Sequence, residues 1–488
     1  MTEPMRALGG AKGNEGRDMN DSQAAIALDP AGQPEMKRAL GPWHLMALGI
    51  GAIVGAGLFS LTGLAAGADA GPAVILAYVI AAVPAGLTGL CYAELAAMFP
   101  KSGSCYTYVR RTAGGLASWI VGWDLILEYA MGAATVAAAF SGYANSILSD
   151  LGLPLPYWLL NGPLGDGAGG VPGVINLPAV LIILACSLLL MRGVTESAWV
   201  NSVIVVVKLL VIALFVALGI GSIKAANFTP FVPPFDTATG GFGWPGVLRA
   251  ASTIFFAYIG FETVSTAAQE CKNAQRDMPI GMLGSLAICT VLYIAFAIVL
   301  VGIVPYAALK DDQASAETAM AATPYAWSRG IIAIGILGGF ATSILTALYG
   351  QSRILQVMAA DGMLPTAIAA IHPRWRTPWR SIILLFVFTA FFAGLVPLAD
   401  LGDMCSIGTL LAFAAVSACV LRLRRTEPAL ERPFRVPLSP ALPLLGIAVC
   451  VLLMSTFDYK AWTRLIGWLL IGLIIRWWLG PRRTSVTA

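Results

Sequence analysis

The chain has 488 residues, of which 58% are hydrophobic and only 11% are charged, and its formal net charge is +4. This composition leaves too few polar side chains to cover soluble domains of that total length, so it excludes a soluble globular protein and predicts an integral membrane protein. The small positive excess is what membrane orientation requires, and it calls for no nucleic-acid partner.

The predicted architecture is all-α, with about twelve transmembrane helices. Residues 1–40 lack the apolar core of a signal peptide and are expected to form a disordered cytoplasmic tail. Beyond them, apolar stretches long enough to cross about 30 Å of hydrocarbon recur, so we expect a transmembrane domain at 41–480 and a cytoplasmic tail at 481–488. The expected helices are 44–66, 72–99, 115–146, 174–191, 198–221, 245–267, 283–304, 330–358, 380–396, 402–422, 439–457 and 463–479.

Lysine and arginine are distributed unevenly between the two sides of this predicted bundle. The connections after even-numbered helices are rich in both, with Arg110, Arg276 and Arg424 as examples, while the opposite side is poor in them. Because positive loops stay in the cytoplasm, this asymmetry predicts that both termini are cytoplasmic.

The first helix contains the stretch GIGAIVGAGLF, from Gly49 to Phe59, whose four glycines need an explanation. One explanation is a small-residue packing face, since Gly51 and Gly55 have GxxxG spacing. The other is that the helix is interrupted there, so that a ligand can approach the backbone.

The second explanation gains support from the sixth helix, where FFAYIGFE, Phe255 to Glu262, occupies the corresponding place. The helix pattern permits a five-plus-five inverted repeat with discontinuous helices 1 and 6, followed by two additional helices. Free N–H groups at such a break favour a carboxylate, and free carbonyls accept from an ammonium group. A zwitterionic α-amino acid has both groups.

Other function classes find less support in the sequence. The eight cysteines show no metal-like spacing and the two histidines lie near helix ends, so neither a structural disulfide, a metal nor another cofactor is expected. An enzyme would need a nucleophile with its base, and a channel would need a filter or a ring of charges. A membrane amino acid sensor that binds without transporting stays open as an alternative.

Seven stretches in order resemble the amino acid, polyamine and organocation transporter superfamily, and within it the bacterial form of the cationic amino acid transporter family. The resemblance runs from about residue 38 to the last helix and implies an inner-membrane permease, not an enzyme, that works by alternating access and is usually proton-coupled. The seven stretches are GIGAIVGAGLF, YAELAAMFPKSGSCYTYV, GWDLILEYAMG, FFAYIGFETVSTAAQE, NAQRDMPIG, LYGQSRILQVMAADGMLP and ERPFRVPLSP.

The resemblance also implies a binding site made mainly of backbone groups. The substrate carboxylate would meet the backbone of Ala56 and Gly57. The substrate amino group would meet carbonyl oxygens of the residues Ile53, Val54, Phe256, Ala257 and Ile259. The chain departs from the family pattern at Gln269–Glu270, where an acidic pair is common, and at Glu262, where aspartate is frequent.

Lys208 lies near the middle of the fifth helix, where an uncompensated ammonium group is costly. As a proton carrier it would donate, when charged, to carbonyls near Gly51 and to a helix-eight hydroxyl such as Ser343, in the place that a sodium ion takes in related carriers. The alternative is a permanently charged strut in an exchanger.

Three carboxylates complete the set of candidate residues. Asp124 and Glu128 share one face of the third helix, and Glu128 is expected to line the pocket and favour substrates with cationic side chains, or else to make an interhelical hydrogen bond. Glu94 is expected to pair with Arg110 or Arg111. A proton-coupled amino acid permease in the lipid bilayer is therefore predicted, with an exchanger of neutral amino acids as the alternative and the oligomeric state open.

Overall fold

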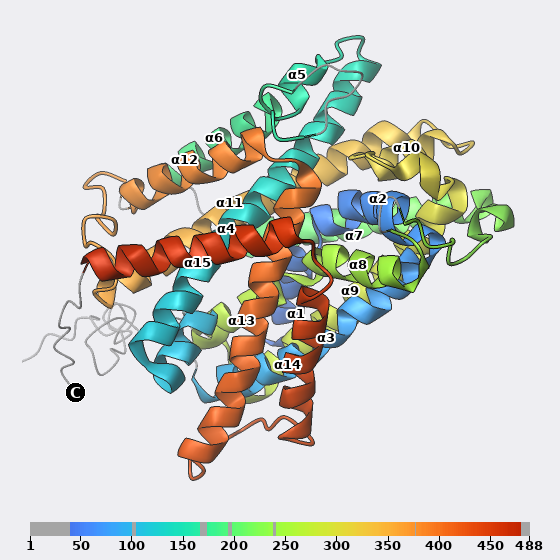
Figure 1. Cartoon of the computed structure of the whole chain (residues 1–488). Coiled ribbons are helices and arrows are strands. Elements are labelled where there is room, and N and C mark those ends of the chain that lie inside the picture. Colours follow the sequence, from blue (N-terminus) through green and yellow to red (C-terminus); the bar gives the residue numbers. More distant parts are fainter. Residues whose placement is uncertain are drawn as a thin grey trace, which may run out of the picture.

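The structure is a computed structural model that describes residues 40–99, 104–165, 173–193, 198–237, 241–375 and 377–479. The two expected tails fall outside these ranges, except for Leu40. Every regular element in the described ranges is helical, and one isolated bridge joins Leu40 to Cys271 (Figure 1).

The twelve expected helices all have counterparts, which confirms the predicted all-α membrane fold. The first five are α1 (Pro42–Ile53) continuing through η1 (Gly57–Leu61), α2 (Thr62–Ala65) and η2 (Ala66–Ala70), then α3 (Val74–Met98), α4 (Ser104–Asp150), α6 (Leu177–Met191) and α7 (Ala198–Gly219). The next five are α8 (Gly243–Ile254) continuing through η6 (Phe255–Tyr258) and η7 (Phe261–Glu270), then α9 (Ala274–Ile303), α11 (Ser328–Ala360), α12 (Trp379–Leu395) and α13 (Leu398–Thr426). The additional pair is α14 (Ala441–Met454) and α15 (Tyr459–Leu479).

Short helices connect these elements. They are η3 (Gly71–Ala73), α5 (Tyr157–Leu160), η4 (Ile220–Ser222), η5 (Ala225–Phe228), η8 (Tyr306–Leu309) and α10 (Ser315–Ala321). Within the described part of the chain, eight helical stretches are long and apolar enough to cross a membrane, and four further apolar helices are shorter.

One expected helix boundary is confirmed and one was wrong. The third helix was expected to begin at 115, and although α4 spans Ser104–Asp150, the non-helical Gly114, with a φ of 83° that favours glycine, divides it at that point. The seventh was expected to begin at 283, but α9 begins at Ala274 because the Asn273 side chain caps it by accepting from the Arg276 N–H at 3.3 Å.

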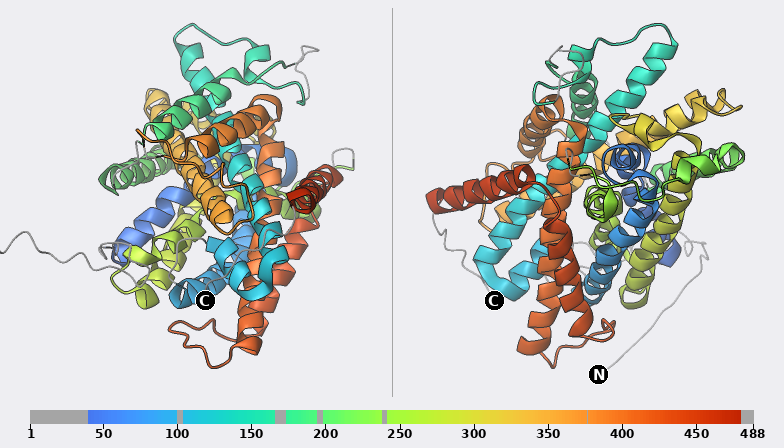
Figure 2. Two further views of the ribbon diagram at one scale, coloured as in Figure 1. Left: turned by 90° about the vertical axis from the view of Figure 1, so that its left-hand side faces the viewer. Right: turned by 45° about the vertical axis from the view of Figure 1, so that its right-hand side comes forward.

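Apolar side chains lie at the surface and ionisable side chains lie in the interior, as expected of a protein surrounded by lipid. Large apolar side chains such as Val291 and Phe391 are more than half exposed, whereas Lys208, Asp124 and Glu128 are almost completely buried. A hydrocarbon environment accounts for both observations, because it favours exposed apolar groups and drives ionisable groups into the bundle. Helix α4 packs extensively against α13 and α11, and α3 packs against α9; α4 lies across α13 (Figure 2).

Candidate functional site

The first helix is interrupted in the middle of the bundle. α1 ends at Ile53, and Val54 has an extended backbone with φ −72° and ψ 110°. The chain becomes helical again at Ala56, where the N–H groups of Leu58 and Phe59 both point to the Gly55 carbonyl oxygen.

The second repeat is interrupted at the corresponding place. Ile259 is extended, with φ −68° and ψ 138°, and Gly260 has φ +120°, a conformation that favours glycine. The Glu262 carboxylate accepts the Gly260 N–H at 2.9 Å, so an acidic side chain satisfies one backbone group that the break leaves without a helical partner.

The two interruptions touch each other, and this contact explains Gly57 and Gly260. A Cβ atom on Gly57 would lie 2.6 Å from the Ala257 Cβ, and one on Gly260 would lie 2.8 Å from the Ala52 carbonyl carbon. By contrast, a Cβ on Gly55 would meet only the Ser343 hydroxyl, at 3.8 Å. Gly57 and Gly260 therefore allow close approach between the two broken helices, whereas a Cβ on Gly49 would lie 2.5 Å from Ser285 Oγ of α9, a contact typical of helix packing on a small residue.

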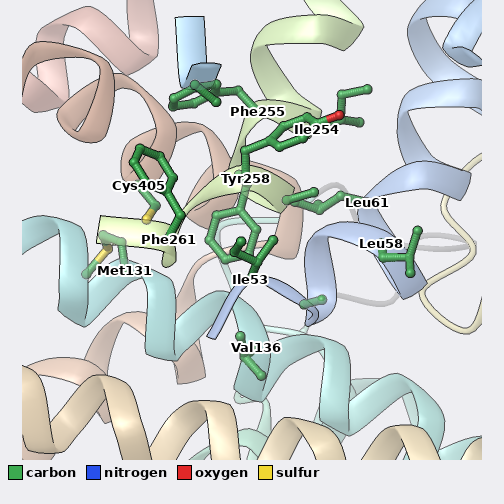
Figure 3. Close-up of a cluster of buried hydrophobic side chains, with 14 of the residues drawn as sticks. Ile53, Leu58, Leu61, Met131, Val136, Ile254, Phe255, Tyr258, Phe261 and Cys405 are labelled. Carbon is green, nitrogen blue, oxygen red and sulfur yellow. The ribbon is translucent and has the colours of Figure 1, made fainter. Parts of the chain in front are cut away.

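Apolar side chains from five segments converge around the breaks. Figure 3 shows Ile53 from α1 near Tyr258 from η6, with Met131 of α4 and Cys405 of α13 on one side and Leu58 of η1 on the other. Ile53, Leu58, Tyr258, Met131 and Cys405 are all at most 3% exposed. The breaks are thus closed off from bulk water in this conformation, which strengthens any electrostatic contact made there.

The backbone groups expected to hold a substrate are mostly buried, and three of their carbonyl oxygens already accept hydrogen bonds. Tyr293 Oη donates to the Ile53 carbonyl at 3.0 Å, and Lys208 Nζ donates to the Val54 carbonyl at 2.9 Å. The Phe256 carbonyl accepts the Ile259 N–H at 3.2 Å. A carbonyl oxygen has two lone pairs, so each keeps capacity for a further donor. The other expected residues lie beside them: Ala56, Gly57, Phe256 and Ala257 are buried, and Ile259 is half-buried.

Sequence reasoning missed Tyr78 and Tyr293, which lie with Tyr258 behind the breaks. Tyr78 donates to the Gly57 carbonyl at 3.4 Å, and Tyr258 donates to the Tyr78 carbonyl at 3.0 Å. The rings of Tyr78 and Tyr293 lie 5.4 Å apart between centroids. A tyrosine within an apolar helix could have revealed these contacts from the sequence, because a buried phenol needs a hydrogen-bond partner and a broken helix supplies free backbone groups.

Lys208 bridges the first helix to the eighth from its position on α7. Its Nζ lies 2.8 Å from the Gly51 carbonyl oxygen, 2.9 Å from that of Val54 and 3.0 Å from Ser343 Oγ. The side chain is 3% exposed, and a Cβ on Gly339 would lie 3.0 Å from Lys208 Cε. The glycine therefore makes room for the lysine stem.

Two buried carboxylates lie on α4 where it faces α13. Both Asp124 carboxylate oxygens and Oε2 of Glu128 have no hydrogen-bond partner among the described residues, and the two side chains are 0% and 3% exposed. A Cβ on Gly408 would lie 3.0 Å from Asp124 Oδ1, and Cys405 Sγ donates to the Glu128 backbone carbonyl at 3.2 Å. The sequence therefore located a buried acidic face correctly.

The expected partner of Glu94 was wrong. Glu94 is 1% exposed and pairs with Arg424, at 2.5 Å, and with Arg432, at 3.7 Å, while the Val436 N–H donates to its Oε2 at 2.7 Å. Arg110 pairs with Asp361 and Arg111 with Glu427. The ERPFRVPLSP stretch folds back over the end of α3 and supplies two of the three contacts, which distance along the chain does not reveal.

At the opposite end of the bundle, α10 is attached to the second half of the broken first helix. The Phe59 carbonyl oxygen accepts from Tyr143 Oη at 2.7 Å and from Ser315 Oγ at 3.0 Å. Ser60 Oγ donates to the Gln313 carbonyl at 2.7 Å, and the Ala316 N–H donates to Tyr143 Oη at 3.3 Å. Ser315 thus joins α10 directly to η1, the loop residue Gln313 adds a second bond just before α10, and Tyr143 of α4 bridges the two elements.

The remaining departures from the family pattern fall on η7. The backbone of Gln269 and Glu270 is helical, but their side chains lie outside the described part of the chain. Glu262 is described, and its contact with Gly260 is the one given above.

Comparison with known proteins assigns this chain with two interrupted helices to a family. The chain matches the family model for amino acid permeases over residues 40–475. The chain belongs to the amino acid permease family. The sequence resemblance to the wider transporter superfamily is thereby confirmed.

Relatives of this permease carry different substrates according to their names. It is 40% identical to the branched-chain amino acid permease BcaP of Bacillus subtilis, over 91% of this chain and 93% of that protein. It is 39% identical to a methylthioribose transporter of the same organism, over 92% and 95%, and 35% identical to the vacuolar cationic amino acid transporter 4 of Arabidopsis thaliana, over 84% and 67%. Family membership therefore identifies the chain as a multi-pass membrane permease.

Proposed function

We propose that this permease is a secondary carrier that moves α-amino acids by alternating access and couples their movement to protons. The observation that carries the proposal is the set of three contacts from Lys208 to Gly51, Val54 and Ser343. A charged ammonium group supplies three donors, and here three oxygens on two other helices receive them.

The coupling follows from what deprotonation does to these contacts. A neutral amine keeps two N–H donors and loses the charge that strengthens each bond, so its hold on the end of α1 weakens. α1 is then freer to move relative to α7 and α11, and the breaks open. In this scheme Lys208 carries the proton, while Gly51 and Ser343 provide the oxygens that distinguish its two forms.

The substrate carboxylate is assigned to the backbone at Ala56 and Gly57, at the positive end of the second half-helix. The substrate ammonium group is assigned to the carbonyls of both breaks, at Ile53, Val54, Phe256, Ala257 and Ile259. The deep burial of these groups and their convergence at the contact between two half-helices support this assignment.

We further propose that Glu128 biases the carrier toward cationic side chains. Its free Oε2 lies in a low-dielectric interior, where a carboxylate attracts a cation strongly. The neutral alternative has support from the similarity to the branched-chain amino acid permease. The two therefore need a direct test.

The orientation belongs to the same proposal. We place the protein in the bacterial inner membrane with both termini in the cytoplasm and with residues 1–40 and 481–488 as tails, because the arginine-rich end of the bundle carries Arg111, Arg424 and Arg432. Labelling of single introduced cysteines from either side of intact cells tests this placement.

The decisive experiment is uptake of labelled arginine, lysine, leucine and alanine into proteoliposomes, with and without an inward-acid pH gradient. Accumulation that requires the gradient supports proton coupling and identifies the substrate class. Uptake that depends only on amino acid trapped inside would overturn proton coupling and make Lys208 a strut. Binding without uptake would replace the carrier by a sensor.

A further inference from the structure

A groove lies between α4 and α13, away from the helix breaks. It has a volume of about 280 Å³ and is lined almost entirely by small aliphatic side chains of these two helices, with Thr112, Cys419 and Arg422 as the polar members. We propose that this groove holds an acyl chain of an anionic phospholipid whose phosphate is bound by Arg422.

The groove exists because α4 bends. Gly114 has φ +83°, which redirects α4 and separates its first ten residues from the straight segment that follows. Small residues then leave space between the helices: Ala117 lines the α4 side, and Ala415 and Ala418 line the α13 side. Ala113 and Ala418 are exposed, so the groove opens to the outside of the bundle.

The polar groups inside the groove are already satisfied by the protein. Thr112 Oγ1 lies 2.8 Å from the Tyr108 carbonyl oxygen and 3.0 Å from Cys419 Sγ. Neither side chain therefore needs a ligand, and the walls present a predominantly apolar surface that suits a hydrocarbon chain.

Arg422 is different, because it lies exposed among the groove-lining residues and no ion pair involves it within the described ranges. Its neighbour Arg424 forms an ion pair with Glu94, and Arg111 forms one with Glu427. Arg425, also exposed, adds a further positive charge on the same helix end. The local charge balance is therefore positive, and it complements an anion.

The combination of an apolar groove and a basic rim at the end of membrane helices fits an anionic lipid. Basic pockets between transmembrane helices bind phospholipid head groups, and an arginine guanidinium pairs with phosphate through two parallel hydrogen bonds. A partner helix also packs on small residues, but it would leave Arg422 without an anion unless it brought an acid to that depth.

Native mass spectrometry of the purified full chain tests the proposal with phosphatidylglycerol and with phosphatidylcholine of identical acyl chains. We expect phosphatidylglycerol to bind at least about tenfold more tightly, and Arg422→Gln to remove most of that preference. Arg425→Gln removes an equal charge, one turn away, from a residue that does not line the groove, so it is the matched control and should keep most of that preference. Equal binding of both lipids, or an unchanged preference in Arg422→Gln, would overturn the proposal.

A separate set of measurements tests whether the groove holds the acyl chain. Ala418→Leu and Ala418→Trp fill the groove by different amounts, and both should weaken phosphatidylglycerol binding while amino acid uptake shows that the chain is folded. Glycerol phosphate, which has the phosphate but no acyl chain, should not compete. Effective competition by glycerol phosphate, or conversion of a dimer to a monomer by Ala418→Leu without a change in lipid binding, would contradict a lipid occupant.

Discussion

Gly57 packs directly against Ala257, which brings the interruption of the first helix into van der Waals contact with that of the sixth. A Cβ on Gly57 would lie 2.6 Å from the Ala257 Cβ and 2.7 Å from its backbone nitrogen. Backbone cannot move aside as a flexible side chain can. The two half-helices must therefore separate to admit even one methyl group.

Gly57→Ala should consequently impair both stability and uptake. Overpacking of this kind typically costs about 1–3 kcal/mol, and here it also spreads the backbone groups assigned to the substrate. Gly55→Ala is the matched control, because its Cβ would lie 3.8 Å from its nearest neighbour, Ser343 Oγ. Melting temperature in detergent and initial uptake rate are the measurements, and equal behaviour of the two variants would refute the close-approach explanation.

Lys208→Ala should abolish uptake driven by a pH gradient while leaving some substrate binding, because the backbone site remains but the group that senses protonation is gone. Lys224→Ala, which removes an exposed lysine outside the candidate spans, should retain coupling. The measurement is uptake at several external pH values in proteoliposomes. Full pH dependence in Lys208→Ala would show that the proton is carried elsewhere.

Glu128→Gln should reduce the preference for arginine and lysine over leucine, since it removes the charge but keeps the shape. Loss of a buried charge contact typically changes discrimination by about tenfold or more. Competition of unlabelled amino acids against labelled substrate gives the preference, and Asp124→Asn, one turn away on the same helix, is the comparison. An unchanged ranking would leave Glu128 with a structural role and favour neutral substrates.

Glu94→Gln should destabilise the arginine-rich end of the bundle strongly. It leaves Arg432, which is 6% exposed, and Arg424 without their carboxylate, and breaking a buried ion pair costs about 3–5 kcal/mol. Glu427→Gln removes the partner of Arg111, where the two side chains are 34% and 54% exposed, and such pairs contribute about 1 kcal/mol or less. Comparable melting temperatures for the two variants would contradict this ranking.

Tyr143→Phe should loosen the attachment of α10. It deletes the donor to the Phe59 carbonyl and the acceptor of the Ala316 N–H, while Ser315 still donates to the same carbonyl. A moderate effect follows, of about 1 kcal/mol per hydrogen bond. Hydrogen exchange of α10 is the direct measurement; protection equal to that of the unmodified protein would show that Ser315 and Ser60 suffice.

The sequence by itself determined the class of protein, the twelve helices and the places where two of them break. These properties follow from local composition: apolar runs of sufficient length must be helical in lipid, and glycine clusters in the first helix and at Gly260 in the sixth mark where a helix can stop. The intramembrane lysine and the acidic face of α4 were visible for the same reason, since charges are rare in such runs.

Only the tertiary structure decided which residues meet. Glu94 pairs with Arg424 and Arg432, more than 300 residues away, and not with Arg110 or Arg111, which are close in sequence. Tyr78 and Tyr293 reach the broken first helix from α3 and α9, and the 280 Å³ groove depends on how a bend in α4 lies against α13. Contacts between distant segments depend on how helices pack, and no single stretch of sequence encodes that arrangement.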